Sequence, residues 1–152
     1  KNLFIVLFST LLISACSTAK KSALDTTDDV YTGTETVKYL ANGVPDRVFF
    51  ATNKSKLTTA SRDTLRKQAT YLRKNKDLTI TLEGHADERG TREYNLALGE
   101  RRANAAKDYL MTYGVSGKRI SVISYGKERP VNPASSPLAW SQNRRSVTVK
   151  AN

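Results

Sequence analysis

The sequence predicts an α+β domain: a two-layer α/β sandwich with elements in the order β-α-β-α-β-β and a mixed four-stranded sheet. Two observations support this. Four short segments have strand patterns, one a continuous apolar run and three alternating apolar with polar residues. Two longer segments have apolar residues at helical spacing, each preceded by a threonine that suits a helix start. No internal repeat is visible in the sequence.

The first strand and helix open the domain. Residues 47–51 are apolar after Arg47, as in a strand buried on both faces. Thr58 or Thr59 caps a helix that runs to about Asn75. The positions that we expect to face the core recur at helical spacing: Leu65, Ala69 and Leu72. Just before this unit, residues 37–40 are expected to form a short helical turn.

The second strand and helix enclose a charged loop. Residues 78–83 alternate and predict a strand. Thr91 suits the N-cap of the next helix. Glu93 would lie in the first turn, where a negative charge interacts favourably with the positive end of the helix dipole. The pattern continues to about Tyr113, where Gly114 ends the helix.

The last two strands follow without a predicted helix between them. Residues 120–125 and residues 145–150 both alternate, which indicates strands. Residues 126–140 contain three of the four prolines, so we expect a long loop there.

The N-terminal region has the composition of an export signal. Residues 1–15 have a basic start, an apolar run and small residues at the end, which predicts a secretory signal peptide. The run ends Ile-Ser-Ala-Cys and resembles a bacterial lipobox, which implies lipidation of Cys16 and cleavage before it. The alternative is an uncleaved signal anchor in which Cys16 is not lipidated. No aspartate follows Cys16, which implies sorting to the outer membrane. Residues 16–36 are polar and predict a flexible tether, so the domain is placed at residues 37–152.

The charge is uneven along the chain. The net charge is +11, yet the first 36 residues hold three lysines against four acids, so the positive excess belongs to the domain. A basic domain favours an anionic partner such as nucleic acid or an acidic wall polymer, or simply has a solvated basic surface. Export would exclude nucleic acid as the partner, because an exported protein does not meet the genome. A single cysteine excludes an internal disulfide, and one histidine leaves no metal-ligand cluster or cofactor motif.

Asp87 and Arg102 are the candidate binding residues. Arg102 lies well along the second helix, where Gly99 and Ala106 on the same line leave room beside it. A guanidinium matches a carboxylate and a carboxylate accepts from an ammonium, so this pair suits a ligand that carries both groups. A structural ion pair between Asp87 and Arg102 explains the pattern equally well.

An enzyme is the competing interpretation. Glu83 and Asp87 are conceivable as the acid and base of a hydrolase, although nothing else nearby looks built to stabilise a transition state. His85 is expected to donate a hydrogen bond to backbone at the end of the sheet rather than to bind a ligand. The sequence therefore favours a binding protein and not an enzyme.

Residues 83–106 carry a family resemblance. They read E-G-H-A-D-E-R-G-T-x-E-Y-N-x-x-L-G-E-R-R-A-N-A-A and resemble the OmpA-like peptidoglycan-binding domain, most of all its Pal lipoprotein branch. The resemblance spans residues 47–150 and includes S-Y-G-K-E-R-P at 124–130 and N-R-R at 143–145. It implies the OmpA-C-like fold and a non-covalent ligand, the meso-diaminopimelate of the peptidoglycan stem.

The resemblance also implies a set of site residues. Asp87 would take the ammonium of the ligand and Arg102 its carboxylate. The residues expected to line the pocket around them are Phe50, Ala86, Thr91, Asn95, Leu98 and Arg145. The family usually has an acid after the first strand, whereas this chain has Ala51, so a ligand contact there would come from backbone.

The implied cellular role is a tether between membrane and wall. The resemblance implies a lipoprotein that faces the periplasm, holds the outer membrane to peptidoglycan, and serves the Tol-Pal system during envelope constriction. TolB would then be a partner that competes with peptidoglycan. The alternative within binding proteins is an OmpA-like lipoprotein outside the Tol-Pal system.

Overall fold

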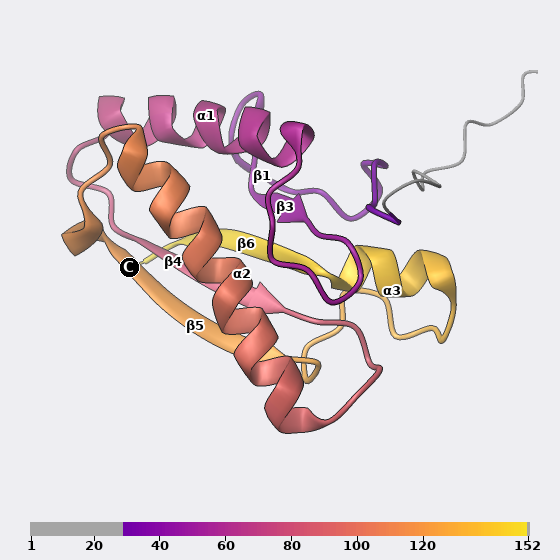
Figure 1. Ribbon diagram of the computed structural model, residues 1–152. Coiled ribbons are helices and arrows are strands. Elements are labelled where there is room, and N and C mark those ends of the chain that lie inside the picture. Colours follow the sequence, from indigo (N-terminus) through magenta and orange to yellow (C-terminus); the bar gives the residue numbers. More distant parts are fainter. Residues whose placement is uncertain (1–28, 152) are drawn as a thin grey trace, which may run out of the picture.

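One four-stranded sheet with helices against it forms the body of the molecule (Figure 1). The computed structural model describes residues 29–151. A two-stranded hairpin precedes the body. The elements are β1 (Tyr39–Ala41), β2 (Val44–Pro45), β3 (Arg47–Phe49), α1 (Thr59–Lys74), β4 (Ile80–His85), α2 (Arg92–Thr112), a 3-10 turn (Gly117–Arg119), β5 (Ile120–Gly126), α3 (Pro137–Asn143) and β6 (Arg145–Lys150).

The sheet is mixed, as predicted. Its strand order is β3-β6-β4-β5. Strand β4 runs parallel to β5, while β6 runs antiparallel to both β3 and β4. The last strand of the chain is thereby inserted at the centre of the sheet. This brings residues just before β6 next to the loops that follow β3 and β4.

Helices α1 and α2 cover one face of the sheet (Figure 1). Leu65, Ala69 and Leu72 of α1 are buried there, as the helical spacing predicted. The core between helices and sheet contains twelve buried side chains, most of them aliphatic, and burial of each large one stabilises the fold by about 1.5–3 kcal/mol. The leucines and isoleucines of this core are Leu65, Leu72, Ile80, Leu82, Leu110 and Ile120.

Both predicted helix starts are confirmed. Thr58 Oγ1 accepts from Ser61 N at 3.1 Å, and Thr91 Oγ1 accepts from Tyr94 N at 3.2 Å. These side chains satisfy backbone donors that have no partner within the helix. At the other end of α2, Gly114 adopts φ +85°, a left-handed conformation that ends the helix as expected.

Two local predictions are wrong. Residues 37–40 do not form a helical turn, because β1 and β2 pair as a hairpin through Gly43, whose φ is +71°. The expected loop at residues 126–140 also contains the start of a helix. Ser136 caps α3 by accepting from Ala139 N at 3.2 Å, and Pro137 occupies its first turn, where the missing N–H costs nothing.

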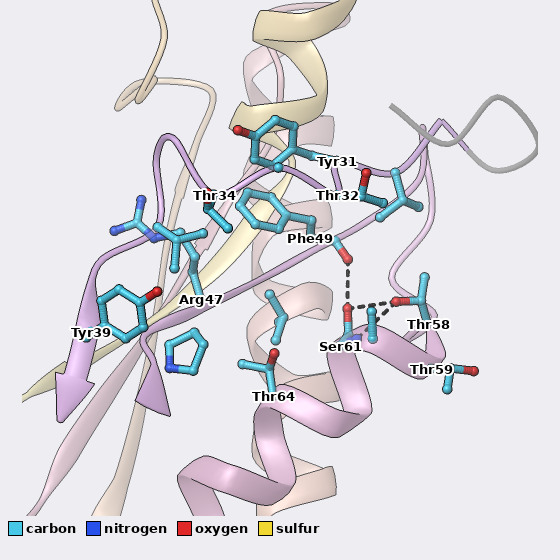
Figure 2. Close-up of a pocket in the computed structure, with 16 residues that line it drawn as sticks. Tyr31, Thr32, Thr34, Tyr39, Arg47, Phe49, Thr58, Thr59, Ser61 and Thr64 are labelled. Atoms are coloured by element: carbon cyan, nitrogen blue, oxygen red, sulfur yellow. Dashed lines mark hydrogen bonds between the residues drawn. The ribbon is translucent and has the colours of Figure 1, made fainter. Parts of the chain in front are cut away.

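The predicted boundary at residue 37 also needs correction. Residues 29–36 were assigned to the tether, yet Val30 and Tyr31 are buried against the sheet. The rings of Tyr31 and Phe49 lie edge to face with centroids 4.8 Å apart, and Figure 2 shows both above the first turn of α1. The packed domain therefore begins no later than Asp29. Cys16 and residues 1–28 lie outside the described residues.

The face of the sheet opposite α1 and α2 is called the outer face here. Its side chains include Glu83 and His85 of β4, and Arg145 and Val147 of β6, which alternate with residues that face the helices. Thr148 faces the helices instead, since its Oγ1 donates to Gln68 Oε1 of α1 at 2.7 Å.

Helix α2 approaches β4 closely at two glycines. A Cβ added to Gly84 would lie 1.8 Å from the carbonyl oxygen of Gly99, and a Cβ on Gly99 would lie 2.3 Å from Ser124 Oγ. No side chain fits between the two backbones. Arg102, three residues after Gly99, is consequently held close to the end of β4.

We predict that Gly84→Ala lowers the free energy of unfolding by about 2–3 kcal/mol, because the methyl group has to push the helix away from the strand. The matched control is Gly117→Ala, whose new methyl group would meet only the flexible end of Met111. Urea denaturation followed by circular dichroism measures both. Equal stability of the two variants would contradict the close approach.

Candidate functional site

The loop between β4 and α2 presents Asp87, and buried contacts fix its shape. Ala86 N donates to Gly126 O at 2.8 Å, which ties the loop to the end of β5. Asn95 is buried, and its Nδ2 donates to Arg89 O at 2.8 Å and to Thr91 O at 3.0 Å. Three predicted pocket residues, Ala86, Thr91 and Asn95, thus shape the loop.

The Asp87 carboxylate is surrounded by cations. Its Oδ2 accepts from Arg89 Nη2 at 2.7 Å and from Arg144 Nη1 at 3.2 Å, while Oδ1 accepts from the backbone N and the Nε of Arg89, both at 3.1 Å. Burial favours the neutral acid, but the hydrogen bonds from Arg89 and Arg144 outweigh it and lower the pKa of Asp87. The residue is therefore a buried, ionised carboxylate.

Arg102 is fully buried and joins three backbone segments. Its Nε donates to Lys54 O at 2.9 Å, its Nη1 to His85 O at 2.9 Å and its Nη2 to Ala51 O at 3.1 Å. The guanidinium also lies 5.4 Å from the centre of the Phe50 ring. Desolvation, reinforced by the charge of Arg144, lowers the pKa of Arg102 to about 9, so the side chain stays cationic at neutral pH.

The two candidate residues do not pair with each other. Among residues 29–151, Asp87 forms ion pairs with Arg89 and Arg144, and no carboxylate lies within 4.0 Å of the Arg102 guanidinium. The structural ion pair considered from the sequence is therefore not the arrangement found. Phe50 packs beside Arg102 as expected, and Leu98 is buried on α2 between Asn95 and Arg102.

The arginine that contacts Asp87 from the end of α3 is Arg144, whereas the predicted Arg145 is the first residue of β6 and lies elsewhere. Arg144 Nε donates to Phe50 O at 3.0 Å, and its Nη1 reaches Asp87. Arg145 points to the outer face, where it lines a pocket with Glu83 and His85. Arg144, at the C-terminal end of α3, and Arg145, at the start of β6, are therefore adjacent in sequence but contact different groups.

Arg89, and the contact with Trp140 that holds its side chain, were not predicted from the sequence. The Arg89 guanidinium lies 4.3 Å from the centre of the Trp140 ring in α3, and Trp140 Nε1 donates to Glu88 Oε1 at 2.7 Å. The side chain of Arg89 is 42% exposed, so it covers Asp87 from the solvent side. The feature of the sequence that could have indicated this contact is the position of Arg89, two residues after Asp87 in a loop that contains Gly90.

An acid does reach the loop after β3, although position 51 is alanine. Asp29 Oδ1 accepts from Thr52 N at 2.9 Å, and Asp29 Oδ2 lies 3.3 Å from Arg144 Nη2. The carboxylate thus comes from the N-terminal segment. The backbone oxygen of Ala51 is already occupied by Arg102.

The proposed hydrolase pair is not assembled. Glu83 lies on the outer face beside His85, with Oε2 3.7 Å from Nε2, whereas Asp87 is held by Arg89 and Arg144 on the other side of the sheet. Within residues 29–151 no three His, Cys, Asp or Glu side chains gather in a way that could hold a metal ion. In the same residues, no helix is both long and apolar enough to span a bilayer.

The model of the family described as the OmpA family matches residues 49–144. The chain belongs to the OmpA family. A peptidoglycan-associated lipoprotein of Rhizobium meliloti is 56% identical over 106 residues, which cover 70% of this chain and 60% of that protein. A protein of the same name from Brucella melitensis is 44% identical over 151 residues, covering 95% of this chain and 89% of its own length.

Solved structures agree with this assignment. The peptidoglycan-associated lipoprotein of Burkholderia pseudomallei superposes with a TM-score of 0.68 at 36% identity, covering 70% of this chain and 90% of that one. The C-terminal domain of Helicobacter pylori MotB has the same fold, with a TM-score of 0.65 at 22% identity. The α+β fold and the resemblance seen in the sequence are thereby confirmed.

We predict that Arg102→Ala lowers the free energy of unfolding by about 3 kcal/mol or more, because it leaves a cavity and three carbonyl oxygens without their donor. The matched control is Arg101→Ala, the neighbouring exposed arginine, which should change stability by less than about 0.5 kcal/mol. Thermal unfolding of both variants provides the comparison. A fully stable Arg102→Ala protein would refute the role of Arg102 as a structural tie.

Proposed function

We propose that the chain binds peptidoglycan non-covalently through the meso-diaminopimelate of the stem peptide. The main support is a buried, ionised acid beside a buried arginine, at the positions where the family resemblance expects them. Diaminopimelate ends in an ammonium and a carboxylate on one carbon, which are complementary to these two groups. The names of the Rhizobium, Brucella and Burkholderia relatives point to the same ligand.

In the proposed complex, the ligand ammonium replaces the Arg89 guanidinium on Asp87. Arg89 is the exposed partner of Asp87, whereas Arg144 is buried and stays in place. The ligand carboxylate accepts from Arg102, which has five N–H groups, three of them bonded to Lys54, His85 and Ala51. Because Arg102 is fully buried, the loop at residues 51–54 has to shift as the carboxylate enters.

The proposed cellular role is that of an outer-membrane lipoprotein anchored through Cys16 and facing the periplasm. Two or three acyl chains, each contributing about 0.8 kcal/mol per buried CH₂, would hold such a domain on the membrane while it binds peptidoglycan. By its resemblance to the Pal branch, the chain would act in the Tol-Pal system, with TolB as a partner and envelope constriction as the process served.

Two alternative functions would give different results in binding assays. An OmpA-like lipoprotein outside the Tol-Pal system would bind sacculi but would not retain TolB in a pull-down. A wall hydrolase would release soluble muropeptides from sacculi, whereas the proposed function gives co-sedimentation without release. The separation of Glu83 from Asp87 argues for the binding protein.

We predict that Asp87→Asn weakens binding of a diaminopimelate-containing stem peptide by about 10- to 100-fold, because a charge-assisted hydrogen bond is lost. Glu88→Gln is the matched control, since the adjacent carboxylate is exposed and bonded to Trp140 and Ser135. Isothermal titration calorimetry measures both affinities. Binding by Asp87→Asn at the parent affinity would rule out this site.

Arg89→Ala should tighten binding of the same peptide by about 3- to 10-fold, because the ligand no longer has to displace an internal cation from Asp87. Arg92→Ala serves as the charge-matched control, as Arg92 is exposed and pairs with Glu128 at 3.4 Å. If Arg89→Ala binds more weakly than Arg92→Ala, Arg89 contacts the ligand instead of competing with it.

A further inference from the structure

The outer face holds a pocket whose lining does not include Asp87 or its partners Arg89 and Arg144. Its volume is about 650 Å³, and it lies between the β1–β2 hairpin, strands β4 and β6, and the loop after β5. Five basic side chains line it against two acidic ones. One of these acids is already neutralised, because Asp46 forms two hydrogen bonds to Arg47, at 2.7 and 2.8 Å.

His85 is buried in the wall of this pocket without a hydrogen-bond partner. The residue is 2% exposed, and neither ring nitrogen has a partner. Its ring is tilted against that of Tyr125 at 5.6 Å, and Glu83 Oε2 is 3.7 Å from Nε2, too long for a hydrogen bond. The expected bond from His85 to backbone is therefore absent. A buried polar group without a partner is destabilising and uncommon in folded proteins.

Arg145 has an unpaired donor in the same pocket. Its Nη1 donates to Asn143 O at 3.3 Å and its Nη2 to Arg129 O at 3.1 Å, but the buried Nε has no partner. The antiparallel register pairs Gly84 with Ser146, so His85 and Arg145 are cross-strand neighbours on the outer face. Two unsatisfied polar groups thus lie side by side.

The surrounding charge selects the kind of ligand. Burial, followed by the charges of Arg145, Arg47 and Arg129, lowers the pKa of His85 to about 3. The imidazole is therefore neutral and has one N–H to donate. Arg129 lies 3.8 Å from the centre of the Tyr125 ring, at the rim of the pocket. Glu83 is the one acid in the lining without a hydrogen bond from an arginine, and the basic side chains outnumber it.

We propose that the outer-face pocket binds a small oxyanion, a phosphate or carboxylate group, held by Arg145 Nε and the neutral ring of His85. The oxyanion supplies the acceptor that both groups lack, and the excess of basic side chains attracts it. This site differs from the proposed peptidoglycan site, because Asp87, Arg102 and Arg144 do not line the outer-face pocket.

The test is a titration of the whole 152-residue chain with sodium phosphate and, separately, sodium acetate, at constant ionic strength and pH 7. Nitrogen-edited NMR follows the Arg145 Nε–H and the His85 ring nitrogens. We expect saturable shifts of both signals with at least one anion, and the anion that binds more tightly identifies the ligand as phosphate or carboxylate.

Two variants separate the site from general attraction to a basic surface. Arg145→Gln should weaken binding by about tenfold or more, while Arg101→Gln removes the same charge from exposed α2 and should bind as the parent does. His85→Phe keeps the ring beside Tyr125 and removes the unpaired nitrogens, so it should melt higher than the parent yet lose anion binding.

Either of two results would overturn the proposal. Shifts that never saturate, or that persist in Arg145→Gln, indicate an adventitious ion only. Unchanged binding in the folded His85→Phe variant would show that the histidine takes no part.

Discussion

The hydrogen bonds of Arg102 are the contact on which the site depends. One buried guanidinium joins the loop after β3, through Ala51 and Lys54, to the end of β4, through His85, and all three bonds start from the middle of α2. The glycine contact between α2 and β4 makes this possible, because any side chain at Gly84 would move the helix outward. The residue proposed to recognise the ligand therefore also holds the loop in place, and a change at Arg102 is expected to affect both.

Asp87 shows a complementary arrangement. A buried carboxylate is costly unless it is paired, and Arg144 supplies a buried partner from the C-terminal end of α3. Arg89 supplies a second, exposed partner that rests on Trp140. Asp87 is therefore held as an ionised carboxylate without a ligand. In the proposed complex, the ligand ammonium would have to displace the exposed Arg89 guanidinium from Asp87. Asp29 completes this cluster from the N-terminal segment.

The sequence predicted both helix caps and the order along the chain of the four sheet strands and the two long helices, because these depend on local periodicity. It failed where distant segments decide. The resemblance placed Arg145 in the ligand pocket, yet Arg145 lies on the outer face, whereas Arg144 reaches Asp87. Tyr31 likewise seemed part of a polar tether, since only Phe49 gives it a place to pack.

The most direct test of the account is the affinity of the chain for two stem peptides that differ only in the third residue, meso-diaminopimelate or lysine. The lysine peptide keeps the ammonium for Asp87 but lacks the carboxylate that would accept hydrogen bonds from Arg102. Calorimetric titration should therefore give about tenfold or greater preference for the diaminopimelate peptide. Equal affinities would contradict recognition of a zwitterion by Asp87 and Arg102.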